Sequence, residues 1–209
     1  MKDYIIIAII GYLFGNFQTS YIMGKWLKKV DIRSLGHGNA GASNAVESLG
    51  WKFGALVAIL DVLKGILAVV LVKRLYHVSF DPQGAFAIYL VGYFAMLGHI
   101  YPFIMNFKGG KGTATMIGLL LGASPLYGIM GILLLILVTV LTDYIAIGTL
   151  ALTLYMLFLT IFKDLGTGAI VLAFLGGALS LKLHLPNYKR MQAGTEGRLS
   201  KVLKKKDKK

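Results

Sequence analysis

The residues best suited to chemistry include a lysine set among glycines in segment 106–115, NFKGGKGTAT, which is the second of three polar segments in chain order. Glycines let a ligand approach the backbone, and the first amides of a following helix carry partial positive charge. Lys111 adds a full positive charge, so this segment is typical of a phosphate site. It is not a nucleotide phosphate loop, because the upstream glycine falls at Met105 and Gly112 replaces the hydroxyl residue after the lysine. A flexible, positively charged turn is the alternative.

A candidate segment later in the chain, 184–196, which we call the third segment, carries a histidine, an amide, an arginine and a carboxylate at His184, Asn187, Arg190 and Glu196. These side chains offer hydrogen-bonding and anion-binding groups. By itself, however, a histidine at the end of a membrane span is more often an interfacial residue than a catalyst.

A candidate segment earlier in the chain, 31–44, which we call the first segment, places glycines among hydroxyl and amide side chains such as Ser34, Asn39, Ser43 and Asn44. Such a segment can wrap a small polar ligand with backbone amides and side chains. A tight connection between helices would use the same residue types, and this alternative stays open.

The elements that must position these segments are membrane helices. The chain has 209 residues, of which 56% are hydrophobic, and a mean hydropathy of +0.71, which indicates a polytopic membrane protein. The apolar start at 5–14 lacks a small-residue cleavage site, so we expect it to belong to the first span. The absence of cysteine excludes disulfides and thiolate metal sites.

The span rule of about 20 apolar residues per crossing predicts helices over six stretches: 4–24, 53–73, 84–105, 112–141, 144–162 and 165–183. The fourth is too long for one crossing, and the break at Gly122–Pro125 splits it into 112–123 and 125–141. Basic residues after the first span and at 201–209 predict two cytoplasmic regions. We therefore predict an all-α integral membrane protein with about seven transmembrane helices, the N-terminus outside and the C-terminus cytoplasmic.

This topology puts all three candidate segments and the turn 142–148 on the cytoplasmic side, so it predicts one cytoplasm-facing site. Residues 1–199 are expected to form a single membrane domain, and 200–209 a basic cytoplasmic tail that attracts anionic phospholipid. No aromatic and basic nucleic-acid surface accompanies the charge of +13. Asp61 and Lys64, three apart in the second span, are expected to neutralise each other.

The three segments together resemble the motifs of the bacterial acyl-phosphate:glycerol-3-phosphate acyltransferases. The most specific stretches are GHIYP at 98–102, FKGGKGTAT at 107–115 and the spacing of His184, Asn187, Arg190 and Glu196; LDVLKG at 60–65 also matches. The resemblance implies a bacterial plasma-membrane enzyme with seven helices and a cytoplasmic active site. It implies no cofactor, no metal, no acyl-carrier protein as direct donor and no obligate protein partner.

The resemblance also implies the substrates, acyl phosphate and glycerol 3-phosphate, and the product, lysophosphatidic acid. Acyl phosphate is already activated, so the 1-hydroxyl can attack it without a protein nucleophile. Catalytic roles are implied for His184, Asn187 and Lys111. Substrate-binding roles are implied for Ser34, Gly38, Asn39, Gly41, Asn44, Lys108, Gly109, Gly110, Gly112, Thr113, Arg190 and Glu196. The resemblance leaves open whether His184 or the donor phosphate takes the proton.

The chain departs from the family pattern at several positions, which identifies it as a divergent member. Glu47 and Asp143 stand where the family has arginines, and Ala146, His37 and Gln18 replace two serines and a proline. Two lost cations and two gained carboxylates are expected to weaken anion binding. An inactive paralogue that binds phosphorylated lipid precursors or partner enzymes is therefore one alternative. A small transporter is another alternative. A transporter is expected to have polar residues at mid-depth of the bilayer, whereas the polar residues predicted here gather at one face.

Overall fold

The computed structural model describes residues 1–206, and every regular element in that range is helical. The elements are α1 (Lys2–Asn16), α2 (Thr19–Leu27), α3 (Ala42–Leu49), α4 (Trp51–Leu75), α5 (Ala85–Ile100), α6 (Thr113–Ala123), α7 (Pro125–Thr142), α8 (Ile145–Phe162), α9 (Thr167–Gln192) and α10 (Leu199–Lys206), with 3₁₀ turns η1 (Ile32–Ser34) and η2 (Phe103–Met105). The predicted all-α class is confirmed.

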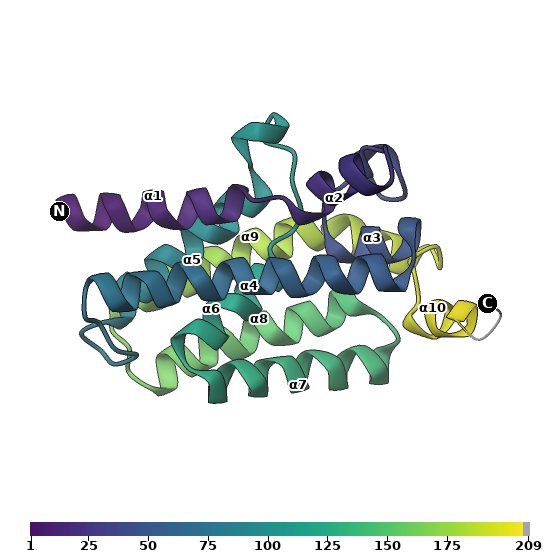
Figure 1. Ribbon diagram of the computed structural model, residues 1–209. Helices are drawn as coiled ribbons and strands as arrows, with labels where there is room; N and C mark the ends of the chain where they lie inside the picture. The colour runs from purple at the N-terminus through teal and green to yellow at the C-terminus, as the bar shows by residue number, and fades with distance from the viewer. Residues whose placement is uncertain (207–209) are drawn as a thin grey trace.

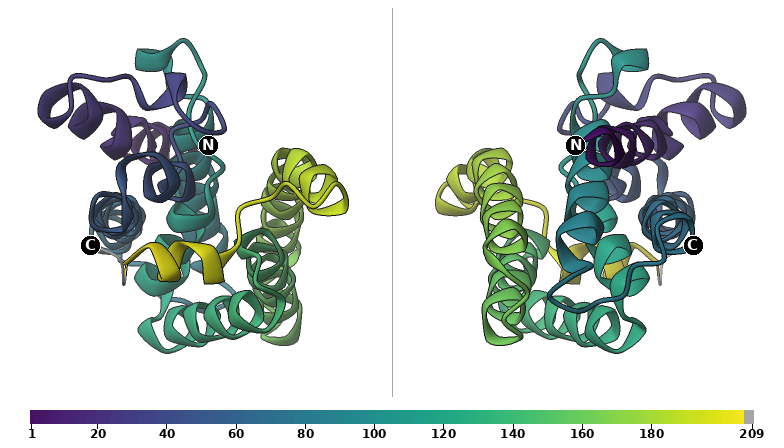
Figure 2. Two further views of the ribbon diagram at one scale, coloured as in Figure 1. Left: turned by 90° about the vertical axis from the view of Figure 1, so that its right-hand side faces the viewer. Right: turned by 90° about the vertical axis from the view of Figure 1, so that its left-hand side faces the viewer.

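The long helices run along one axis, with the N-terminus and helix α10 at opposite ends (Figure 1). Viewed along that axis, α4 and α9 lie on opposite sides of an arc of helices (Figure 2). Within the described chain, six stretches are long and apolar enough to cross a membrane. α5 is the most deeply buried of these and α7 the least, so α5 forms the centre of the bundle and α7 faces lipid.

Glycines set the closest helix contacts. A Cβ on Gly15 or Gly98 would collide with the facing helix where α1 crosses α5, and Gly65 and Gly118 do the same for α4 and α6. Small residues let backbones approach, which is how membrane helices gain packing energy when lipid is as apolar as the side chains. These contacts hold α1 against α5 and α4 against α6.

The helix break predicted in the fourth stretch is present at Ser124, where α6 ends and Pro125 begins α7. Pro125 at the first helical position explains the new start, since its missing N–H is not needed there. α6 has only 11 residues, which at 1.5 Å per residue is about 16 Å, half of the hydrocarbon core. The number of crossings, seven, stays a prediction.

Two boundaries differ from the sequence expectation. The first stretch is not one continuous helix, because α1 and α2 are separated at Phe17 and Gln18. The last helix does not end at 183 but continues to Gln192 through Pro186. A proline removes one backbone donor from the helix, which a long helix with tertiary support tolerates. His184 and Asn187 therefore lie on a helix and not in a loop.

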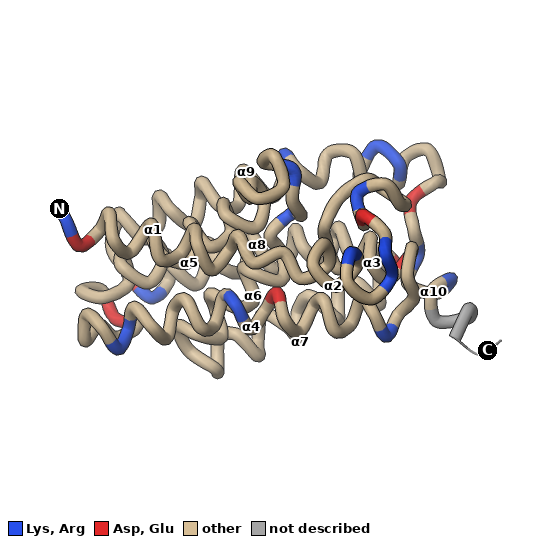
Figure 3. Tube along the Cα trace, turned by 45° about the horizontal axis from the view of Figure 1, so that its top comes forward, with Lys and Arg blue, Asp and Glu red and all other residues tan. Residues whose placement is uncertain are grey.

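The expected tail at 200–209 begins as helix α10, and its residues 207–209 lie outside the described range. Lys and Arg are concentrated at the end of the bundle that carries α2, α3 and α10 (Figure 3). The first segment also contains a helix, α3, at its end. The first segment and the end of the third lie toward the same end of the molecule as α10, the second segment lies near the middle of the long axis, and the connections 76–84 and 163–166 lie at the opposite end (Figure 1).

Candidate active site

Backbone contacts join the first and second candidate segments. The amide of Ala40 donates to the carbonyl of Gly109 at 3.1 Å. The guanidinium of Arg33 donates to the carbonyl of Met105 at 2.8 Å and is itself paired with Asp31 at 2.7 Å. Segments more than 60 residues apart in sequence are therefore held together, as predicted.

A chain of polar side chains joins the second and third segments. Lys111 Nζ donates to Asn187 Oδ1, and Asn187 Nδ2 donates to Glu196 Oε1 at 2.6 Å. Arg190 Nε donates to the other oxygen of Glu196, also at 2.6 Å. Asn187 and Glu196 are buried, so the carboxylate fixes both the amide and the guanidinium. We call these four residues the polar chain.

His184 lies one helical turn before Asn187 on α9 and is 5% exposed. Its Nδ1 lies 2.8 Å from the carbonyl oxygen of Ser180. A carbonyl can only accept, so Nδ1 carries the proton of the neutral ring, and Nε2 keeps its lone pair. The imidazole is thus oriented to accept a hydrogen bond at Nε2.

The polar chain contains a buried donor that nothing satisfies. Within the part of the chain that the structure describes, Arg190 Nη2 is buried and has no hydrogen-bond partner. A buried cationic N–H group without an acceptor is costly, so such groups are normally paired. An anionic oxygen bound beside Glu196 would supply the missing acceptor.

Lys111 is partly buried, and this lowers its pKa from 10.5 to about 8. Burial is the main cause and the nearby Arg190 adds to it, while Glu196 and Glu47 oppose the shift. The lysine is therefore a cation at neutral pH that becomes neutral in moderately alkaline solution.

The glycine loop that carries Lys111 is recessed within the bundle. Gly112 has φ +87° and is the N-cap of α6, so the helix begins directly after the lysine. α6 and α7 meet at Ser124. Because α6 is seven residues shorter than α7, its start lies about 10 Å short of the far end of α7 at 1.5 Å per residue. His184 likewise lies eight residues, or about 12 Å, before the end of α9. The site therefore lies deeper in the bundle than the ends of the long helices.

Asn44 organises the first segment. Its side-chain amide donates to the carbonyls of Ile32, Leu35 and Asn39 at 2.8–3.2 Å, and its oxygen accepts from the amide of His37 at 2.7 Å. With 2% exposure, this side chain is fully engaged in shaping the loop.

The other expected site residues make local contacts. Ser34 is exposed and donates to the carbonyl of Asp31, and Asn39 accepts from the amide of Gly41. Gly38 adopts φ +71° within the same loop, where a side chain would be strained. The hydroxyl of Thr113 lies 3.3 Å from that of Thr149 on α8. Lys108 is exposed at the edge of the site.

The two carboxylates that depart from the family pattern each have a partner. Glu47 Oε2 lies 3.0 Å from Nε2 of His37, another departing residue. Asp143 accepts from the amide and hydroxyl of Ser200 at 2.8 and 2.7 Å and so anchors the start of α10. Neither contact was apparent from sequence, because each joins residues whose proximity depends on the fold.

Comparisons with known proteins agree on one family. A family model described as glycerol-3-phosphate acyltransferase matches residues 5–194. The chain is 39% identical over 206 residues to glycerol-3-phosphate acyltransferase 1 of Oceanobacillus iheyensis, covering 97% of this chain and 98% of that protein. It is 37% identical over 201 residues to the glycerol-3-phosphate acyltransferase of Clostridioides difficile, covering 94% and 96%.

Two solved structures have the same fold. Both are crystal structures of PlsY (YgiH), an integral membrane glycerol 3-phosphate acyltransferase, and both are 29% identical to this chain. The glycerol 3-phosphate form gives a TM-score of 0.84 and covers 94% of this chain and 96% of that one. The lysophosphatidic acid form gives 0.82 and covers 96% and 98%.

Proposed function

Because the chain belongs to the glycerol-3-phosphate acyltransferase family, we infer that it moves a fatty acyl group from acyl phosphate to the 1-hydroxyl of glycerol 3-phosphate. The product is lysophosphatidic acid, a precursor of membrane phospholipid. The protein is a multi-pass membrane enzyme of bacterial type. The observation that supports this activity most directly is the polar chain, which joins the lysine of the glycine loop to a second cation beside His184.

We propose that Lys111 and the amides at Gly112 and Thr113 hold the phosphate of the acyl donor, whereas the amide of Gly110 is engaged by the carbonyl of His99. The free amides at the start of α6 and the ammonium group supply positive charge in a recessed position. Burial makes this charge more effective, because the surroundings screen it less than water does. Gly109 and Gly110 let the loop pack directly on the end of α5, where a Cβ would collide with the carbonyl and the imidazole of His99. Lys108 adds charge at the entrance.

Arg190 is proposed as the second anion-binding group, and its unpaired Nη2 supports this role. Glu196 would hold the guanidinium in place, so that Nη2 points at an anionic oxygen and not at the carboxylate. In the first segment, Asn44 would maintain the loop in which Ser34, Gly38, Asn39 and Gly41 contact glycerol 3-phosphate.

The chemical step needs no group that the chain lacks. The 1-hydroxyl oxygen attacks the acyl carbonyl carbon, the bond from that carbon to the phosphate oxygen breaks, and the phosphate leaves as hydrogen phosphate, which carries away the hydroxyl proton. His184 Nε2 would orient the hydroxyl by accepting its hydrogen bond, because Nδ1 is fixed on Ser180. Asn187 holds Lys111 beside this position.

The active site is proposed to face the cytoplasm. The basic residues around α2, α3 and α10 support this orientation, since positively charged loops are retained on the cytoplasmic side (Figure 3). The match of the chain to the acyltransferase family speaks against the transporter alternative. The partners of Glu47 and Asp143 give these carboxylates roles that are compatible with an active enzyme.

Turnover by the isolated protein tests the function. Protein purified in detergent should convert palmitoyl phosphate and glycerol 3-phosphate to lysophosphatidic acid and an equal amount of inorganic phosphate. A chelator should leave the rate unchanged, and palmitoyl-acyl-carrier protein should give no product. Absence of turnover, together with failure to rescue an acyltransferase-deficient bacterial strain, would support the inactive paralogue instead.

A further inference from the structure

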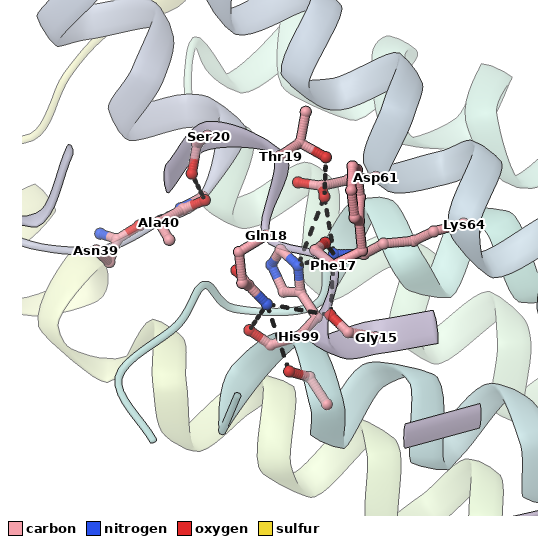
Figure 4. A network of polar contacts seen from close by, with 12 residues as sticks. Gly15, Phe17, Gln18, Thr19, Ser20, Asn39, Ala40, Asp61, Lys64 and His99 are labelled. Carbon is pink, nitrogen blue, oxygen red and sulfur yellow. Dashed lines mark hydrogen bonds and ion pairs between the residues drawn. The ribbon is translucent and has the colours of Figure 1, made fainter. Parts of the chain in front are cut away.

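A second group of buried polar side chains lies outside the proposed site, in the interior of the bundle. Lys64 Nζ is 2.9 Å from Asp61 Oδ1 and 2.9 Å from His99 Nδ1 (Figure 4). All three side chains are at most 4% exposed. We call this group the buried triad. The expected pairing of Asp61 with Lys64 is confirmed, and His99 lies beside this pair.

The buried triad provides hydrogen-bond partners for groups at the break between α1 and α2. Lys64 Nζ donates to the carbonyls of Gly15 and Phe17 at 3.2 and 2.7 Å, which α1 leaves free at its end. Thr19, the first residue of α2, donates its hydroxyl to Asp61 Oδ1 at 3.0 Å. An ammonium at a helix C-terminus and a carboxylate at a helix N-terminus both have the favourable sign. Unsatisfied backbone groups in a bilayer cost several kcal/mol each, so this break depends on the triad.

Gln18 connects the same break to the end of α5. Its Nε2 donates to the carbonyls of Gly15, Gly98 and His99 at 3.1, 3.3 and 3.0 Å (Figure 4). The side chain is fully buried. The ends of α1 and α5 are therefore fixed relative to each other by one amide and one ammonium group.

His99 connects the buried triad to the glycine loop. Its carbonyl accepts from the amide of Gly110 at 3.0 Å, and the next carbonyl, of Ile100, accepts from Gly109 at 3.0 Å. The imidazole packs so closely on Gly110 that a Cβ there would collide with Nε2. Because an ammonium group only donates, Lys64 fixes Nδ1 as the acceptor and thereby fixes the ring. Lys111 follows Gly110 directly.

We propose that Lys64 and His99 are positioning residues for the phosphate-binding glycine loop. Lys64 holds the imidazole, the imidazole and its carbonyl hold Gly110, and Gly110 sets the place of Lys111. This inference rests on the proposed function of the loop. It also goes beyond charge neutralisation, which would require only that Asp61 and Lys64 face each other.

Helix α4 supplies a matched control. Lys73 lies on the same helix and also donates to carbonyls at a helix end, those of Gly122 and Ala123 at 3.2 and 3.0 Å. That end of α6 is opposite to the glycine loop. Lys64→Met and Lys73→Met therefore remove the same chemical group from the same helix, but only the first disturbs the loop.

The test compares kinetics and proteolysis of these variants. For Lys64→Met we expect the KM for palmitoyl phosphate to rise at least about tenfold with a much smaller change in kcat, because a displaced loop loses binding before chemistry. Trypsin cleavage after Lys108 and Lys111 should also accelerate by about tenfold, since cleavage needs local opening. Lys73→Met should change neither quantity. Equal behaviour of the two variants would overturn the proposal.

Two further variants cover the remaining outcomes. If the pair only neutralised charge, Asp61→Leu combined with Lys64→Met would restore KM, because no buried charge would remain; the proposal expects KM to stay raised. If Lys64→Met does not fold, His99→Asn keeps an acceptor for Lys64 but removes the ring from Gly110, and an unchanged KM and cleavage rate would refute the proposal. Failure of the proposed function would instead appear as no turnover in the unsubstituted protein, while the cleavage comparison would still report on the loop.

Discussion

Replacing Lys111 by alanine should lower kcat/KM for palmitoyl phosphate by at least about 100-fold, the usual loss when a positioned charge-stabilising group is removed. The ammonium group belongs to the residue just before the N-cap of α6, and its removal also leaves Asn187 Oδ1 without its donor. Initial rates over a range of palmitoyl phosphate concentrations measure the effect. Lys182→Ala, an exposed lysine on α9, is the control and should keep the full rate.

The pH dependence of the same reaction provides a second readout for Lys111. Its pKa of about 8 means that the ammonium form is present below pH 8 and is lost as pH rises through that value. We therefore expect kcat/KM for palmitoyl phosphate to fall above pH 8, since this ratio reports on the free enzyme. Lys111→Arg should move the decline out of the accessible range, because arginine stays charged. A profile that is flat to pH 9.5 in the unsubstituted enzyme would remove Lys111 from phosphate binding.

The second large effect is expected at His184. His184→Ala should lower kcat by about 100- to 1000-fold, because the attacking hydroxyl loses the acceptor that orients it. The melting temperature should change little by comparison, since the ring makes one hydrogen bond, to the carbonyl of Ser180. Steady-state kinetics at saturating concentrations of both substrates would measure kcat.

The control for His184 is a histidine at the other end of the bundle. His77 is exposed and has φ +51°, so asparagine, which tolerates this conformation, is the suitable replacement. His77→Asn should retain the unsubstituted kcat. If His184→Ala retained it too, the imidazole would have no part in the reaction.

Much of this architecture can be predicted from sequence, because a lipid bilayer restricts the length, composition and flanking charge of the helices that cross it. Apolar length and charge asymmetry predict the helical class, and Gly122–Pro125 predicts the break between α6 and α7. The convergence of the three polar segments follows from placing them on one side of the membrane. The contacts of Lys111 with Asn187 and of Arg190 with Glu196 are consistent with that prediction.

Other features depend on contacts that no local pattern encodes. The break at Phe17 contains neither proline nor glycine, and it exists because Lys64 and Gln18 satisfy the freed carbonyls. The continuation of α9 through Pro186 likewise depends on packing of the helix. A signal for His99 was available in principle, since an ionisable residue in an apolar span is seldom without a role.

The central claim is that the three polar segments meet at the cytoplasmic face, and labelling of single cysteines tests it most directly. The chain contains no cysteine, so each introduced thiol is unique. Ser43→Cys, Lys108→Cys and Gln192→Cys place one exposed thiol in or beside each segment, and Gln83→Cys places one at the opposite end. With a membrane-impermeant maleimide, the first three should react only in inside-out vesicles and Gln83→Cys only in right-side-out vesicles. Reaction of Lys108→Cys and Gln192→Cys from opposite faces would contradict the account.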